Sequence, residues 1–196
     1  IQSSNYSSNS SFTFSGWINL SDYNINTSSS CNDFRFFSNE SSSGKSIVVG
    51  WRQNGSDTGF STYLWNQSQN GAQYDHYPIN QTPPSVNDWH HLVSKYENGS
   101  SLKMYLNGQL FYNSTISINL GLANPVLSNN TSLPLNFGRN LTSFCYTDGK
   151  LDDFAFWSRA LTSQEIQKLY SSQSNHTYAW SNGETTETIN VAPTQT

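Results

Sequence analysis

Charged residues are scarce in this chain, which has nine Lys and Arg against thirteen Asp and Glu and a formal net charge of −4. A nucleic-acid partner needs concentrated positive charge to neutralise phosphates, so this composition argues against nucleic-acid binding. Long apolar runs are also lacking. Runs such as Ile47–Val49 are far shorter than the roughly 20 residues that cross a bilayer, so no membrane insertion is expected.

Aromatic residues, by contrast, make up 14% of the chain, and Ser, Thr and Asn together exceed a third of it. This composition suits a β-sandwich with aromatic inner faces and hydroxyl- and amide-rich loops. The chain also carries fourteen Asn-x-Ser/Thr sequons. Two interpretations stay open: a composition bias in a secreted bacterial protein, or N-glycosylation in a eukaryotic secretory pathway. Both place the protein outside the cell or on its surface.

Hydrophobic alternation predicts strands separated by turn residues. In residues 11–20, Phe12, Phe14, Ile18 and Leu20 fall on one face and should point into the core. Asn98-Gly99 and Asn107-Gly108 are typical of tight hairpins. The one expected helix covers 162–171, with Thr162 as its cap and Glu165 completing a capping box. The expected strands are 11–20, 33–38, 44–52, 58–66, 88–97, 101–107, 109–115, 133–139 and 149–157, and residues 67–87 are expected to form a loop.

Three segments carry a family resemblance: SFTFSGWINL (11–20), NDWHHLVSKYENGSSLKMYLNG (87–108) and GKLDDFAFWSRALTSQEIQKLY (149–170). In this order and spacing they resemble the LamG-like jelly-roll domain of the concanavalin A-like lectin/glucanase superfamily. The resemblance implies an all-β, two-sheet antiparallel jelly roll with one short C-terminal helix. We assign residues 1–173 to this domain. Residues 174–196 resemble the start of an immunoglobulin-like repeat and form either that start or a linker.

The superfamily includes lectins, carbohydrate-binding modules, laminin-type adhesion domains and glycoside hydrolases, so the fold alone does not decide function. Its laminarinase-type hydrolases present their acids in an E-x-D-x-E strand. The sequence has no such run, and we therefore expect that the protein is not an enzyme. The favoured function is a monomeric, non-catalytic extracellular recognition module that binds a glycan within a larger secreted or cell-surface protein. The alternative is a protein-binding or spacer domain of a multidomain adhesin.

Aromatic and polar residues suited to sugars concentrate in one region of the chain. Aromatic faces stack on sugar C–H patches, while amides, Arg and Asp bind hydroxyls. The alternative is that these aromatics fill the sandwich. The candidate ligand-binding residues are Trp51, Arg52, Tyr63, Trp65, Tyr74 and His76.

Two adjacent histidines, His90 and His91, lie on a predicted strand and should point to opposite faces, so they cannot share a metal. We expect them to be structural residues packed beside Trp89.

Asp152 is the candidate metal ligand. Strand alternation puts it on the same face as Phe154 and Phe156, so its carboxylate should point inward and require a partner. A cation, Arg139, Arg159 or backbone N–H groups would each serve. The resemblance favours a structural Ca²⁺, because an Asp on the equivalent strand of laminarinase-type relatives helps to bind calcium.

The only two cysteines are Cys31, in the loop after the first strand, and Cys145, in the loop before the Asp152 strand. These loops can meet at one end of a sandwich, and an oxidising compartment favours a disulfide between them. Two independent free thiols are the alternative.

Overall fold

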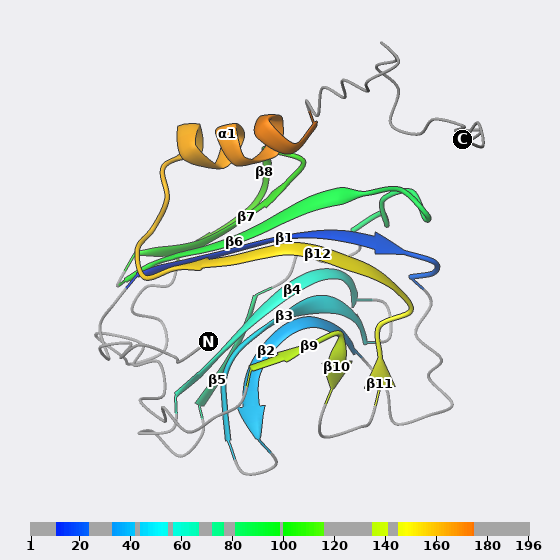
Figure 1. The fold of residues 1–196 in the computed structure, drawn as a ribbon. Coiled ribbons are helices and arrows are strands. Elements are labelled where there is room, and N and C mark those ends of the chain that lie inside the picture. Colours follow the sequence, from blue (N-terminus) through cyan, green and yellow to red (C-terminus); the bar gives the residue numbers. More distant parts are fainter. Residues whose placement is uncertain are drawn as a thin grey trace, which may run out of the picture.

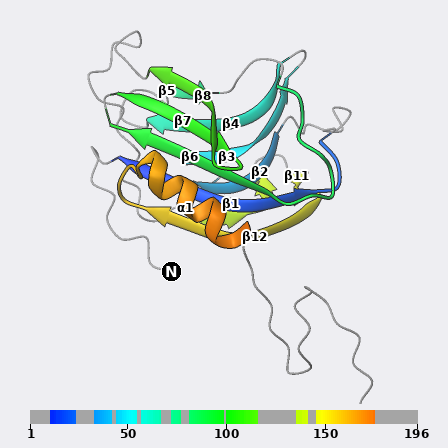
Figure 2. The same ribbon diagram turned by 90° about the horizontal axis from the view of Figure 1, so that it is seen from above.

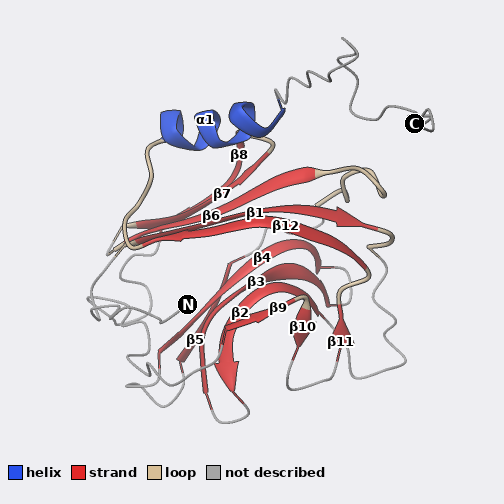
Figure 3. Ribbon diagram, viewed as in Figure 1, coloured by secondary structure: helices blue, strands red, loops and turns tan. Residues whose placement is uncertain are grey.

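A computed structural model describes residues 11–23, 33–41, 44–54, 57–66, 72–76, 81–98, 100–115, 135–140 and 145–174. Two antiparallel five-stranded sheets stack face to face, and one helix covers the outside of one of them (Figure 1). Figure 3 shows that the described part is otherwise built from strands and loops. The predicted two-sheet jelly roll with a C-terminal helix is therefore confirmed.

The order of the strands defines the two sheets. Sheet A runs β12 (Gly149–Trp157), β1 (Phe12–Leu20), β6 (His90–Glu97), β7 (Ser101–Leu106) and β8 (Gln109–Thr115). Sheet B runs β5 (Ala72–His76), β4 (Asp57–Asn66), β3 (Gly44–Asn54), β2 (Asp33–Ser41) and β9 (Leu135–Phe137). A short ribbon pairs β10 (Arg139–Asn140) with β11 (Cys145–Tyr146) beside β2.

Two short strands were not expected from the sequence. β5 lies inside the predicted loop 67–87 and pairs along β4 from His76 to Ala72. Its residues include no β-branched side chain, so the local sequence gives little strand signal and the pairing comes from β4. β11 likewise forms only by pairing with β10.

The core is formed by the facing sides of the two sheets. The alternation predicted for residues 11–20 is confirmed, since Phe12, Phe14, Ile18 and Leu20 are all buried in it. Phe14 of sheet A stacks on Phe37 of sheet B at 4.8 Å between ring centroids. A buried hydroxyl pair, which satisfies two polar groups in an otherwise apolar layer, also crosses between the sheets: Thr62 Oγ1 lies 2.8 Å from Ser94 Oγ.

A β-bulge interrupts the pairing of β1 with β12. Ser15 pairs with Ala155 and Trp17 with Asp152, so Asp153 and Phe154 together face Gly16. Asp153 adopts a left-handed conformation with φ of 48°. Because of this extra residue, the side chains before the bulge point to the opposite face of the sheet from the one that plain alternation along β12 would give.

The helix α1 (Ser163–Ser174) begins as the sequence predicts. Glu165 N–H donates to Thr162 Oγ1 at 3.2 Å, and Thr162 N–H donates back to Glu165 Oε2 at 2.7 Å. Arg159 donates to both Glu165 carboxylate oxygens at 3.0 and 2.6 Å. These bonds, with that from Arg159 the strongest, lower the pKa of Glu165 to about 2.

α1 lies across the outer face of sheet A (Figure 2). A second small core forms beneath it from buried residues of β6, β7, the helix and the segment that leads into it, namely Val93, Tyr105, Ile166 and Leu161. Trp17 stacks on Tyr170 of the helix at 5.9 Å. The helix thus buries a sheet face that would otherwise expose large apolar side chains.

The Asn107-Gly108 hairpin between β7 and β8 is confirmed. Both residues have positive φ, 49° and 75°, as a type I′ turn requires. The Asn107 side chain also binds the neighbouring strand: its Oδ1 accepts from His91 N–H at 2.9 Å, and its Nδ2 lies 3.2 Å from His90 Nδ1. The turn residue therefore fixes β6 as well as the hairpin.

Candidate functional site

The outer face of sheet B, which points away from the core, is polar. The register of β2, β3 and β4 places seven described side chains there: Asp33, Arg35, Ser38, Val48, Arg52, Ser61 and Tyr63. Arg52 and Tyr63 are half-buried and the other five are buried. Solvent therefore reaches this face at Arg52 and Tyr63.

Arg52 and Tyr63 form a joined pair. Arg52 Nη1 donates to Tyr63 Oη at 2.8 Å, and the guanidinium carbon lies 5.4 Å from the centroid of the Tyr63 ring. The position opposite Arg52 is Gly59, and Ser61 lies between Gly59 and Tyr63 on the same face, so the described residues between the pair on β4 are small. The arrangement presents guanidinium donors, a phenolic oxygen and an aromatic ring in one place.

A buried ion pair lies on the same face, beside Arg52. Arg35 Nε donates to Asp33 Oδ2 at 2.8 Å, and both side chains are almost wholly buried. Asp33 pairs directly with Arg52 in the β2–β3 register, so the buried pair lies beside the half-exposed one. This ion pair was not predicted from the sequence, although an Asp and an Arg two residues apart on a strand share a face, and that spacing was a usable signal.

Trp51 is not where the ligand hypothesis requires it. It is only 1% exposed and packs edge-on against Tyr23 and Phe60 at 4.7 and 5.0 Å between centroids. The prediction of Trp51 as a ligand-binding residue is corrected. Side chains alternate along β3, and Trp51 takes a core-facing position while Arg52, the next residue, faces outward.

The other three candidate residues are placed only by their backbones. Trp65 pairs with Gln73, Tyr74 with Leu64, and His76 with Thr62. Their side chains lie outside the described residues, so their part in ligand binding stays a prediction. Of the six candidate residues, the structure brings Arg52 and Tyr63 into contact.

Asp152 is exposed rather than inward-facing, which corrects the sequence-based expectation. The bulge at Asp153 puts Asp152 opposite Trp17 on the outer face, and Leu151 takes the inward position opposite Ile18. Asp152 Oδ1 accepts from the Asp153 N–H at 2.8 Å, one of the partners expected for it. Among the described residues no group of three or more His, Cys, Asp or Glu side chains is placed to hold a metal. Calcium binding stays a prediction, tested by thermal unfolding with EDTA and with added Ca²⁺.

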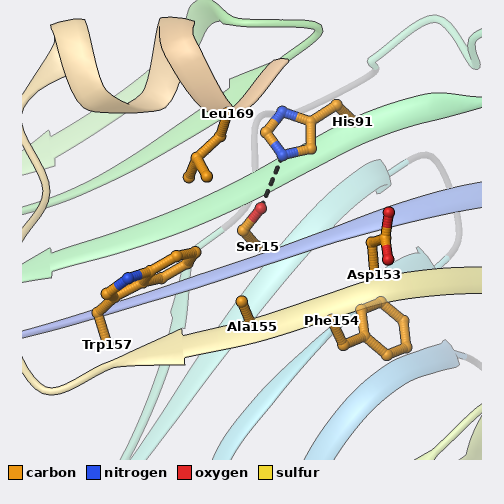
Figure 4. A pocket seen from close by; sticks show the side chains of 7 residues that line it. All are labelled: Ser15, His91, Asp153, Phe154, Ala155, Trp157 and Leu169. Atoms are coloured by element: carbon orange, nitrogen blue, oxygen red, sulfur yellow. Dashed lines mark hydrogen bonds between the residues drawn. The ribbon is translucent and has the colours of Figure 1, made fainter. Parts of the chain in front are cut away.

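His90 and His91 point to opposite faces as expected. His90 Nε2 lies 2.9 Å from Ser85 O, whereas His91 Nε2 lies 2.7 Å from Ser15 Oγ (Figure 4). The expected neighbour was wrong: His91 packs on Trp17 at 5.1 Å, and Trp89 is 42% exposed. The aromatic neighbour of His91 is Trp17 because Trp17 of β1 pairs with His91 of β6 across the sheet.

The Ser15–His91 contact is a poor catalytic arrangement. A nucleophilic serine needs a histidine base oriented by a third group, yet among the described residues His91 Nδ1 has no hydrogen-bond partner. Burial also lowers the pKa of His91 to about 4, which weakens it as a base.

The structure bears on the predicted disulfide and on one of the sequons. Cys31 lies outside the described residues and of Cys145 only the backbone on β11 is described, so the disulfide stays a prediction. The sequon at Asn19 is buried, and its Nδ2 donates to Asn87 O at 3.0 Å. Asn19 therefore cannot carry a glycan in the folded domain.

Tyr146 is an exposed aromatic residue that the sequence analysis did not select. It is 63% exposed on β11, and the Arg139 guanidinium lies 5.8 Å from its ring centroid. Because β11 was not predicted, no alternation marked this side chain as outward-facing.

The fold defines a two-sheet antiparallel jelly-roll sandwich. A family model described as "Concanavalin A-like lectin/glucanases superfamily" matches residues 1–167. The chain belongs to this superfamily. No curated protein matches the sequence.

Solved structures share the fold at low sequence identity. The binding domain of Paraclostridial Mosquitocidal Protein 1 matches with a TM-score of 0.59 and 18% identity over 87% of this chain and 39% of that one. Domain 4 of AbnA, an extracellular GH43 arabinanase of Geobacillus stearothermophilus solved with arabinotriose, gives 0.57 and 17% over 84% of this chain and 68% of that one. The binding domain of botulinum neurotoxin serotype G gives 0.56 and 19% over 86% of this chain and 37% of that one, so this chain spans well under half of that domain. Identities this low establish the fold alone.

In the described part of the chain, no helix combines the length and apolar character needed to cross a membrane.

Proposed function

We propose that this domain is a non-catalytic, extracellular glycan-binding module of a larger secreted or cell-surface protein, and that it binds through the outer face of sheet B at Arg52 and Tyr63. The observation that carries the proposal is the Arg52–Tyr63 pair, which is half-exposed and held by a 2.8 Å hydrogen bond. Sugars need an aromatic surface together with fixed hydrogen-bond donors and acceptors, and this pair supplies both.

Pre-organisation favours this site. Arg52 is bound to Tyr63, and the neighbouring Asp33–Arg35 ion pair is buried, so little side-chain freedom remains to be lost when a ligand binds. The arabinanase domain with the same fold, solved with arabinotriose, supports an oligosaccharide as the ligand class. The poor catalytic geometry at Ser15 and His91 supports a module that binds without reacting.

A glycan array with the purified domain tests the proposal. We expect binding to at least one oligosaccharide, weakened about tenfold or more by Tyr63→Ala and by Arg52→Gln, since a lost hydrogen bond to a charged group costs about 1.5–3 kcal/mol. Tyr146→Ala is the matched control: it removes an exposed tyrosine elsewhere and should leave binding unchanged.

Trp65→Ala extends the test to a candidate residue whose side chain is not described. If the array gives no signal, or if the control weakens binding as much as Tyr63→Ala does, the proposal is wrong. The protein-binding or spacer alternative then takes its place.

A further inference from the structure

A cavity of about 250 Å³ lies on the opposite side of the molecule, between the outer face of sheet A and helix α1 (Figure 4). It is separate from the Arg52–Tyr63 site, which lies on the other sheet. The described residues that line it come from β1, β6, β12 and α1: Ser15, His91, Asp153, Phe154, Ala155, Trp157 and Leu169.

The floor of the cavity is polar but uncharged at neutral pH. Ser15 and His91 are 3% and 2% exposed and bind each other at 2.7 Å. Burial holds the imidazole in its neutral form, because the charged form would lose its hydration. Neither residue therefore contributes a charge to the cavity.

Asp153 supplies the charge. It is the one charged side chain among the described residues that line the cavity, and it is exposed. The β-bulge directs it there: with φ of 48°, Asp153 is the extra residue between Ala155 and Asp152. Bulges commonly redirect a side chain toward a functional surface, and they do so at a cost in backbone strain.

The remaining wall is apolar. Ala155 and Trp157 follow Asp153 along β12, and Leu169 faces them from α1 (Figure 4). The cavity thus has an anionic end and an apolar, aromatic end.

We propose that this cavity binds a small organic ammonium cation, an alkyl chain about as long as a lysine side chain that ends in a charged amine. The ammonium group binds the Asp153 carboxylate, and the alkyl stem lies against Ala155, Leu169 and Trp157. An anion would be repelled by Asp153, and the volume is below the roughly 300–1,000 Å³ typical of drug-sized ligands, so the occupant is small. A free amine and a lysine of a peptide share this chemistry.

Titration of the domain with three probes, followed by NMR, tests the proposal. The probes are n-pentylammonium, Nα-acetyl-lysine N-methylamide and its uncharged counterpart, Nα-acetyl-norleucine N-methylamide. We expect saturable binding of a cationic probe at least about tenfold tighter than that of the norleucine compound, the factor that about 1.4 kcal/mol provides. If both cations bind, a free amine suffices; if only the lysine compound binds, the occupant is a peptide lysine. The proposal is overturned if neither cation binds more tightly than the norleucine compound, or if no probe binds saturably.

Two adjacent aspartates provide matched variants. Asp153→Asn should weaken cation binding about tenfold or more, and Asn tolerates a positive φ well. Asp152→Asn should leave it unchanged, because Asp152 is also exposed but does not line the cavity. The Asn also keeps the oxygen that accepts the Asp153 N–H. If Asp153→Asn binds cations as wild type does, the proposal is wrong; the comparison of charged and uncharged probes on wild type decides it even if that variant folds poorly.

Discussion

The ring of Phe154 occupies the space that a side chain at Gly16 would fill. A Cβ added to Gly16 would overlap the Phe154 ring atoms Cδ1 and Cε1. Phe154 follows directly in the register from the Ser15–Ala155 pair and turns inward over β1, where its ring stacks on Phe137 at 5.1 Å. Gly16 is thus required by packing between β1 and β12.

Gly16→Ala should therefore destabilise the domain by about 1–3 kcal/mol, the usual cost of overpacking a well-packed site. Urea unfolding measures the change. In a Phe154→Leu background the same substitution should cost less, because the smaller side chain leaves room for the new methyl group. Equal costs in the two backgrounds would show that the ring is not the obstacle.

The capping box of α1 gives a second prediction. Thr162→Ala removes the oxygen that accepts the Glu165 N–H and should lower the free energy of unfolding by about 1 kcal/mol. Ser172→Ala serves as the control on the same helix, because its hydroxyl only binds the Leu169 carbonyl within the helix, and it should stay within about 0.5 kcal/mol of wild type. A loss in the control as large as in Thr162→Ala would contradict the capping role.

Local patterns predicted the features that depend on nearby residues. The alternation of Phe12 and Phe14, the Asn107-Gly108 turn and the Thr162 cap all follow from near neighbours in the chain, and each is confirmed. Asp152 was misplaced because one extra residue reverses the strand's facing, and the periodicity of two carries no sign of where a bulge falls.

The candidate binding site was predicted in part for the same reason. Arg52 and Tyr63 were selected by residue type, and their shared outer face follows from the β3–β4 register. Trp51 was selected by the same criterion but lies in the core. Composition marks aromatic residues suited to a ligand, yet only the pairing of strands decides which of them face outward.

His91 predicts a pH dependence of stability. Its pKa is lowered by burial from 6.5 to about 4, while in the unfolded chain it returns to the ordinary value, so the unfolded state takes up the proton first. The stabilising contribution is complete above about pH 6.5 and is lost as the pH falls toward 4. Since each pH unit between the two pKa values removes about 1.4 kcal/mol, the loss is on the order of 3 kcal/mol.

Comparison with His91→Gln isolates this residue from the other titrating groups. Glutamine keeps a hydrogen-bonding side chain near Ser15 but does not titrate. Asp153, which lines the same cavity, is unchanged in both proteins. The free energy of unfolding of wild type should fall more steeply than that of the variant between pH 6.5 and 4, and identical slopes would exclude His91 as the cause.

A disulfide between Cys31 and Cys145 remains the strongest untested prediction from the sequence. These are the only two cysteines, and an extracellular module would fold under oxidising conditions. A cross-link that closes so long a segment should stabilise the domain by about 4–5 kcal/mol on the chain-entropy account.

Intact mass after alkylation, with and without prior reduction, detects the bond: the native protein should take up label only after reduction. A Cys31→Ser/Cys145→Ser double variant should then unfold at lower urea concentration than wild type and should no longer respond to reductant. Labelling of both thiols in the native, unreduced protein would rule the bridge out.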